Sequence, residues 1–167
     1  MIADSGSGPS EQTSLRSKTP IAVWIATVGG VGYAPVAPGT FGSAVGLVLW
    51  WLLPHATIVH ASAIILLFVL GCWTGSVAER HFGRTDPGQV VIDEVVGMLI
   101  TMLLNPVGWK SGIAGFLLFR VMDVIKPFPS NRLERLHGGV GVMADDAMAA
   151  VYANAVLRLL ILASGIW

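Results

Sequence analysis

The chain has 167 residues, of which 54% are hydrophobic and only 12% are charged, and its net charge is zero. Soluble domains carry about 25% charged residues, so this composition, with a mean hydropathy of +0.72, predicts an integral membrane protein. Because the chain has no excess of basic residues, its charge gives no indication of nucleic-acid binding. The single cysteine, Cys72, excludes an internal disulfide and a cysteine-rich metal site.

The N-terminal residues 1–19 are rich in Ser, Gly and Thr and contain almost no apolar side chains. We predict that they form a disordered polar tail, and that residues 20–167 form a single helical membrane domain. The first apolar run, residues 21–28, is short, ends in two glycines and lacks a clear cleavage site for a signal peptide. We expect it to lie at the membrane interface or to enter the membrane only partway.

A segment rich in Gly and Pro follows over residues 29–43 and predicts a shaped loop. Such a loop lets backbone N–H groups approach an anion, and the hydroxyls of Thr40 and Ser43 could donate to a phosphate. Ser43 is also a candidate N-cap for the next helix. A rigid turn between two membrane helices explains the same pattern, and no Gly-Lys-Ser/Thr follows to make a Walker loop.

Two apolar runs, residues 44–53 and 56–78, are separated by Pro54-His55. The second is long enough to span a bilayer, since ~20 helical residues cross the hydrocarbon core. The first would need residues 40–43 or a thinned bilayer to complete a crossing. We predict a helical hairpin that turns at Pro54.

Two adjacent acids, Asp93 and Glu94, stand at the head of the apolar run 90–104. They lie about 100° apart around a helix, so we expect one to face a site while the other caps the helix or supports the first. Acids at a helix start are also favoured by the helix dipole alone. A charge at the centre of a membrane helix costs ~2.5 to 3.5 kcal/mol, less toward the ends, and a mere cap would avoid that cost by lying further out.

The apolar run 111–125 delivers Arg120, Asp123 and Lys126 at three-residue steps before Pro127. Residues three apart are neighbours on a helix. The residue before a proline is disfavoured in the helical region, so Lys126 should stand at or near the terminus. One helix end therefore gathers three charges.

The last landmark is a glycine-rich polar segment, residues 129–141, before a final apolar helix that we expect to reach about residue 163. Asp145 and Asp146 stand at the start of this helix. A plain N-cap role for Asp145 is the alternative, because Asp is among the best N-cap residues.

The helix pattern brings these groups to one side of the membrane if the hairpin 40–78 and the pair 95–105 and 111–125 each cross and return. The predicted fold class is thus all-α: a polytopic helical membrane protein whose short apolar helices and glycine-rich loops converge on the cytoplasmic face. The cytoplasmic orientation follows from the positive-inside rule, because one side collects Arg16, Lys18, Arg80, Arg84, Lys126, Arg132 and Arg135.

Carboxylates without sulfur or paired histidines suit a hard cation such as Mg²⁺, which is often shared with substrate phosphates. The candidate metal ligands are Asp93, Glu94, Asp123, Asp145 and Asp146, and all except Asp145 are also candidate catalytic residues. The candidate phosphate-binding residues are Arg120, Lys126, Thr40 and Ser43. A site at a membrane surface implies an amphiphilic phosphate substrate, and phosphate-ester hydrolysis is the chemistry that fits.

Four sequence blocks, in order, resemble the phosphatidylglycerophosphatase A family: PVAPGTFGS (35–43), DEVVG (93–97), FRVMDVIKPFP (119–129) and GGVGVMADD (138–146). The resemblance implies an Mg²⁺-dependent enzyme that removes the terminal phosphate of phosphatidylglycerophosphate to give phosphatidylglycerol. It also implies the bacterial inner membrane, where the apolar runs and the basic residues predict a multi-pass protein with its active site facing the cytoplasm, and no obligate protein partner is inferred. One departure is Ala150, where the family pattern leads us to expect glycine.

The competing interpretation is a non-enzymatic membrane transporter or helix-bundle scaffold whose charges are ion relays or structural pairs. Such a protein is expected to carry its charges near mid-span, whereas these stand at helix ends. Two other phosphatase mechanisms lack their motifs. A thiol nucleophile would need an arginine six residues after Cys72, and an aspartyl-phosphate mechanism would need an Asp-x-Asp sequence, and neither occurs.

Overall fold

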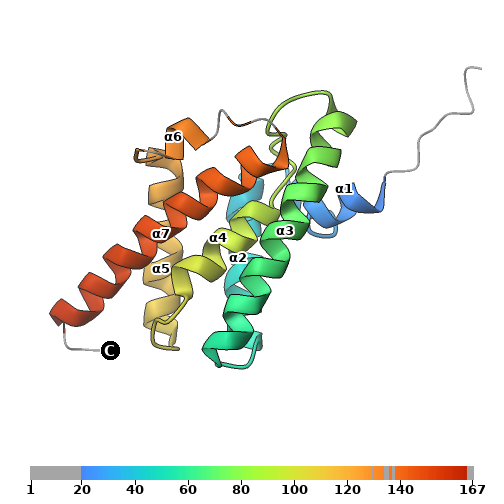
Figure 1. Cartoon of the computed structure of the whole chain (residues 1–167). Helices are drawn as coiled ribbons and strands as arrows, with labels where there is room; N and C mark the ends of the chain where they lie inside the picture. The colour runs from blue at the N-terminus through green and yellow to red at the C-terminus, as the bar shows by residue number, and fades with distance from the viewer. Residues whose placement is uncertain (1–19, 129, 134–135, 137, 165–167) are drawn as a thin grey trace, which may run out of the picture.

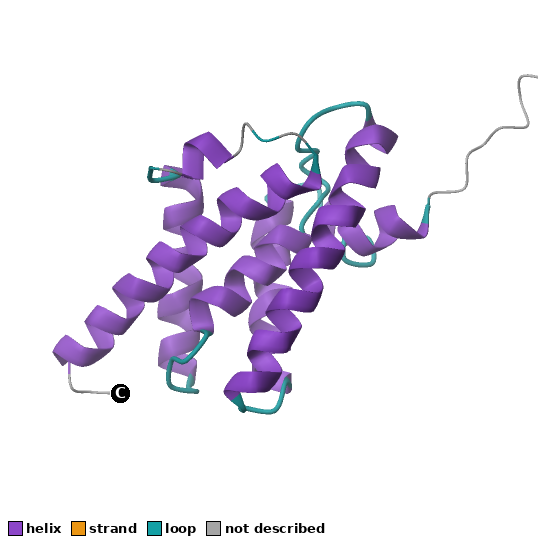
Figure 2. Cartoon of the chain, in the orientation of Figure 1, coloured by secondary structure: helices purple, strands orange, loops and turns teal. Residues whose placement is uncertain are grey.

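The computed structural model describes residues 20–128, 130–133, 136 and 138–164, so the predicted tail, residues 1–19, lies outside it. Every regular element in the described part of the chain is a helix (Figures 1 and 2), as the sequence predicted. In chain order these are α1 (Ile21–Ala26), the 3-10 turn η1 (Val31–Tyr33), α2 (Pro38–Leu52), α3 (Thr57–Phe82), α4 (Ile92–Met102), α5 (Trp109–Ile125), α6 (Ser130–Leu133) and α7 (Gly139–Ser164).

The short helix α4 lies at the centre of the bundle and packs against α2, α3, α5 and α7 (Figure 1). Nine of its 11 residues are buried, which is the pattern of a helix enclosed on nearly all sides. A helix of this length extends only about 16 Å, roughly half the ~30 Å hydrocarbon core of a bilayer. The short helix α4 is thus enclosed by the longer helices α2, α3, α5 and α7.

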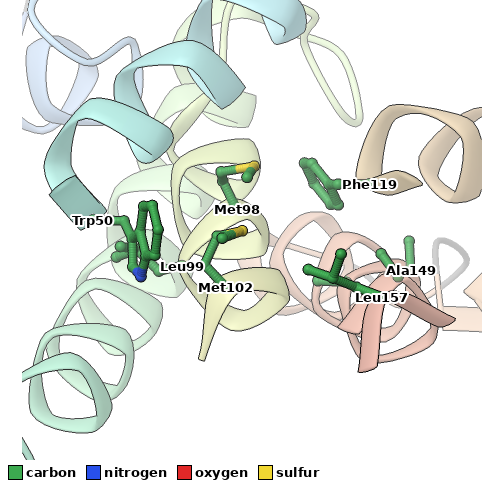
Figure 3. Close-up of a cluster of buried hydrophobic side chains, with 9 residues drawn as sticks. Trp50, Met98, Leu99, Met102, Phe119, Ala149 and Leu157 are labelled. Carbon is green, nitrogen blue, oxygen red and sulfur yellow. The ribbon is translucent and has the colours of Figure 1, made fainter. Parts of the chain in front are cut away.

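The main hydrophobic core gathers side chains from the helices around α4 (Figure 3). Met98, Leu99 and Met102 of α4 meet side chains of the other helices; these are Trp50 of α2, Phe119 of α5, and Ala149, Ala150, Ala153 and Leu157 of α7. Ala150, which departs from the family pattern, is fully buried in this cluster. Its methyl group is accommodated by the packing.

The C-terminal end of α4 is held by polar side chains of α7. The last carbonyl groups of a helix have no partner within the helix, and inside a bundle they need another donor. The Asn154 amide donates to the carbonyl oxygens of Ile100, Thr101 and Leu103 at 3.1, 2.8 and 2.9 Å. This arrangement lets α4 end within the protein.

The predicted glycine loop is partly wrong, because α2 begins at Pro38 and takes up residues 38–43 as helix. Proline is well suited to the first position of a helix. Gly39, Gly42 and Gly46 then lie three and four residues apart on the face of α2 that packs on α4. A Cβ at Gly46 would stand 2.7 Å from Met98 Cβ and 2.8 Å from the Val95 carbonyl oxygen, so these glycines permit the close approach of the two helices.

The early start of α2 also overturns the N-cap prediction for Ser43, which is buried inside the helix. In the same way, α7 begins at Gly139, so Asp145 stands almost two turns inside it and is not its N-cap. Gly139 starts the helix against α3, where its N–H donates to Ser76 Oγ at 2.8 Å. The predicted helix start at Asp145 and the N-cap candidate Ser43 are therefore wrong, because glycine usually punctuates chains, whereas here it serves helix contact.

The predicted hairpin turn at Pro54 is present between α2 and α3. The two helices, however, make few direct contacts with each other, and α4 packs against both. The two helices of the hairpin are therefore held together mainly through α4, which packs against both.

Two helices, α3 and α7, are each 26 residues long and apolar enough to cross a membrane by length and composition. Only 22% of the most apolar stretch of each is buried, whereas the core helix of a soluble protein is mostly buried. The exposed apolar face of α3 includes Ile58, Ile65, Leu66, Val69 and Trp73. Exposed apolar surface of this extent marks an interaction site, and a lipid surface is the one that the composition indicates.

The packing of α2 on α4 predicts that Gly46→Val destabilises the protein. The new side chain would collide with backbone of α4, and overpacking of this kind costs ~1 to 3 kcal/mol. The thermal midpoint of the purified protein in detergent should fall. Gly88→Ala is the matched control, because Gly88 lies in a turn with nothing within 4 Å of its Cβ position. Equal midpoints for the two variants would contradict the close contact.

Candidate active site

Three acidic side chains converge where α7 passes the first turn of α4. Asp93 and Glu94 of α4 and Asp146 of α7 each offer one carboxylate oxygen, and these oxygens lie within 4.8 Å of one another. Asp93 is 7% exposed and Asp146 5%. From their separation of about 100° around the helix we expected one of the two adjacent acids to face a site and the other to cap the helix or support the first, and the structure brings an oxygen of each into the same group. The longer side chain of Glu94 compensates for its different angle on the helix.

The three carboxylates are short of hydrogen-bond donors. Asp93 Oδ1, Glu94 Oε2 and Asp146 Oδ2 are buried and have no hydrogen-bond partner in the described part of the chain. Two unit charges about 4 Å apart repel by about 4 kcal/mol at an effective dielectric of about 20, which exceeds what a typical hydrogen bond returns. A hard cation that prefers carboxylate oxygens would relieve this repulsion. The acidic cluster, meaning Asp93, Glu94 and Asp146, therefore fits a metal ion.

Arg120 is fixed beside the acidic cluster by two groups. Its Nη1 atom lies 2.8 Å from Asp123 Oδ2 and donates to Ser43 Oγ at 3.5 Å. Asp123 itself lies close enough to Asp146 to interact with it through their side chains. Arg120 and Asp123 thus join the acidic cluster to form one continuous polar site.

The two predicted hydroxyl groups have different environments. Ser43 is 0% exposed, and its hydroxyl donates to the Gly39 carbonyl oxygen at 2.9 Å, so it supports Arg120 from within the protein. Thr40, in the first turn of α2, is partly exposed, and the described hydrogen bonds at Thr40 include its N–H to the Ala37 carbonyl.

Gly39 is a site residue that the sequence did not single out. A Cβ at this position would come within 2.2 Å of Glu94 Oε1 and 3.2 Å of Arg120 Nη1. The absence of a side chain therefore makes room for a carboxylate and a guanidinium. The spacing of Gly39, Gly42 and Gly46 is the signal that could have indicated a helix face at this point, because residues three and four apart share a face.

Lys126 and Asp145 form a second charged group next to the first. Lys126 Nζ lies 2.8 Å from Asp145 Oδ2. Lys126 is the C-cap of α5, as predicted, and has a left-handed backbone with φ of 47°. Asp145 is buried but lies outside the acidic cluster. The structure thus divides the predicted charges into a cluster with Arg120 and a separate ion pair.

All of these groups lie at one end of the bundle. Figure 1 shows α6, the start of α7 and the loop after α3 at this end, and the turns between α2 and α3 and between α4 and α5 at the other. Four of the predicted cytoplasmic basic residues belong to the site end: Arg80, Arg84, Lys126 and Arg132. Arg16, Lys18 and Arg135 lie outside the described residues.

Sequence comparisons place the chain in a known family. The family model described as Phosphatidylglycerophosphatase A matches residues 24–161. The chain is 34% identical over 131 residues to the Phosphatidylglycerophosphatase A of Escherichia coli, covering 77% of this chain and 76% of that protein. It is 39% identical over 128 residues to the protein of the same name from Haemophilus influenzae, covering 74% and 78%.

A third relative carries a different name. A protein of Bacteroides thetaiotaomicron named "Putative phosphatidylinositol-3-phosphatase" is 38% identical over 141 residues, covering 78% of this chain and 87% of that protein. No solved structure gives a significant match. From the family model and these relatives, the chain belongs to the phosphatidylglycerophosphatase A family, a family of phosphatases, as its four sequence blocks indicated.

Proposed function

We propose that the protein hydrolyses the terminal phosphate monoester of phosphatidylglycerophosphate, giving phosphatidylglycerol and inorganic phosphate, with Mg²⁺ as cofactor. The observation that carries the proposal is the acidic cluster next to a fixed arginine at one end of an apolar helix bundle. The names of the family and of the relatives from E. coli and H. influenzae support the substrate. A transporter or scaffold has no support from this family.

Asp93, Glu94 and Asp146 would hold Mg²⁺, with Asp123 beside them. The ion fits because each of these three side chains has a buried oxygen without a hydrogen-bond partner among the described residues, and because Mg²⁺ binds through a few carboxylates together with substrate phosphate oxygens. When bound, it would supply positive charge to the phosphoryl group as the bond from phosphorus to the glycerol oxygen breaks.

Arg120 would bind the terminal phosphate group that hydrolysis removes from the lipid. Among the described residues, the contacts with Asp123 and Ser43 both use Nη1, so Nε and Nη2 of the guanidinium fork could donate to phosphate oxygens. Asp123 orients the guanidinium as well as adjoining the metal site. Because Ser43 is fully buried, we propose that it positions Arg120 and does not touch phosphate, in contrast to the role predicted from the sequence.

Thr40 and Lys126 would complete the recognition of the anionic headgroup. Thr40 stands in the first turn of α2 and is partly exposed, so its hydroxyl can donate to a phosphate oxygen. The Lys126 side chain is 28% exposed and is held by Asp145, so it can attract a phosphate at the rim. We therefore assign Asp145 to holding Lys126, and not to the metal as the sequence suggested.

We propose that the protein is a multi-pass protein of the bacterial inner membrane with this site on the cytoplasmic side. The exposed apolar faces of α3 and α7 support membrane insertion. Arg80, Arg84, Lys126 and Arg132 at the site end support the orientation, because cytoplasmic segments carry an excess of basic residues.

A second candidate substrate is a phosphatidylinositol 3-phosphate, which the name of the Bacteroides relative suggests. It shares the chemistry of the first candidate, a phosphate monoester on the headgroup of a phospholipid. The acidic cluster and Arg120 recognise that shared group, so the two substrates must be separated by experiment.

The activity test measures phosphate release from both lipids by the full chain in detergent, with Mg²⁺ or with a chelator. We expect release from phosphatidylglycerophosphate that requires Mg²⁺. Asp146→Asn should lower turnover by about 100-fold or more, as loss of metal-linked charge stabilisation does, with an unchanged elution profile. Glu79→Gln, which changes a carboxylate outside the cluster, is the control. Full turnover by Asp146→Asn, or in the presence of chelator, would refute the metal site.

The orientation is tested with single cysteines in a Cys72→Ser background. Arg84→Cys should be shielded from an impermeant thiol reagent in intact cells, and Pro54→Cys should react, because the two exposed positions lie at opposite ends of the bundle. Labelling of both positions from outside the cell is incompatible with the proposed crossing.

A further inference from the structure

Arg158 is a charged residue that the proposed reaction does not use. It lies on α7 twelve residues beyond Asp146, which is about 18 Å along a helix axis, toward the end opposite the active site. Its Nη2 atom donates to the carbonyl oxygens of Leu103 at 3.4 Å and Leu104 at 3.1 Å. These bonds anchor it at the C-terminal end of α4.

The charge of Arg158 lacks a counter-ion within the described residues, since the described ion pairs join Arg120 to Asp123 and Lys126 to Asp145. Its Nε atom is buried and has no hydrogen-bond partner there. An arginine in apolar surroundings without a compensating anion is unfavourable. Arg158 therefore has positive charge and donor capacity left for an anion beyond its bonds to the carbonyl oxygens.

Two surface grooves meet at Arg158 and are bounded by α4, α7 and the segment after α4. One has a volume of about 360 Å³ and the other about 160 Å³. The larger groove is lined, apart from Asn154 and Arg158, by the apolar residues Ile100, Leu103, Leu104, Val151 and Ala155. The Arg158 guanidinium thus borders an apolar groove on the outer surface of the bundle.

We propose that Arg158 and the larger groove bind one anionic phospholipid, with its phosphate on the guanidinium and part of an acyl chain between α4 and α7. Arginine donates to phosphate through a planar fork, which supplies the missing anion. The apolar lining favours a lipid over a free phosphate ion, because burial of each CH₂ group is favourable. The proposal rests on the membrane placement proposed above, but not on the phosphatase reaction.

The position of the groove gives this lipid a structural role. It would touch α4 and α7, which carry Asp93, Glu94 and Asp146 at the other end. The lipid would lie in the leaflet opposite the active site, so it is not a substrate molecule in turnover. It would secure the contact of the two helices that form the acidic cluster.

The test titrates phosphatidylglycerol into the delipidated full chain in detergent, and follows bound lipid by native mass spectrometry and the thermal midpoint. Phosphatidylcholine with the same acyl chains and inorganic phosphate are the comparison ligands. We expect phosphatidylglycerol to bind and to raise the midpoint, and the other two to have little effect. Arg158→Gln should weaken this binding by about tenfold, the loss expected for a charge-assisted contact.

Lys110→Gln is the matched control, because Lys110 is an exposed cation at the same end of the bundle. Ala155→Phe is the second variant, since it fills the groove and leaves Arg158 and its bonds to α4 in place. It should weaken lipid binding even where Arg158→Gln fails to fold.

Phosphate release by the same variants is measured in parallel. Loss of lipid binding in Arg158→Gln and Ala155→Phe but not in Lys110→Gln supports the lipid site, whatever the substrate proves to be and whether or not turnover falls with it. Phosphatidylglycerol binding unchanged in Ala155→Phe and Arg158→Gln, equal binding of phosphatidylcholine, or an equal midpoint shift from inorganic phosphate would each overturn it.

Discussion

The convergence of three carboxylates, two from the first turn of α4 and one from α7, is the constraint on which the rest of the structure depends. Asp93, Glu94 and Asp146 repel one another in a poorly hydrated interior, and their convergence is tolerable if a cation neutralises them. The central position of α4 is what allows the three carboxylates to meet. A short central helix can place its N-terminal turn next to α7, α2 and α5 at once, whereas a helix at the edge of the bundle could not.

The two ends of α4 are supported in different ways. At the N-terminal end, Gly39 gives space to Glu94 and Arg120. At the C-terminal end, Asn154 and Arg158 donate to carbonyl groups that the short helix cannot satisfy itself. In between, the apolar core around Met98 and Met102 fixes the register (Figure 3). The charged site can therefore be rigid although it lies at a helix end, where helices usually fray.

The sequence predicted the helices and the participating charges, because charge is scarce in this chain and each acid or base in an apolar run stands out. It also indicated the pair of Arg120 and Asp123, which are three residues apart on one helix, but it could not predict the pairs that join different helices. Lys126 is held by Asp145 of α7, and this pairing depends on how α5 and α7 cross. The glycines of α2 were misread as a loop because their spacing, and not their number, carries the packing information. Arg158 gave no local signal, because its partners are backbone carbonyls.

The most direct test of the acidic cluster is the binding of Mn²⁺, as a spectroscopic substitute for Mg²⁺, to the full chain in detergent, followed by electron paramagnetic resonance without substrate. The acidic cluster predicts saturable Mn²⁺ binding that Mg²⁺ displaces, and strong weakening of that binding in Asp93→Asn and in Asp146→Asn but not in Glu79→Gln. Equal Mn²⁺ affinity in all four proteins would contradict the assignment of these carboxylates to a metal site.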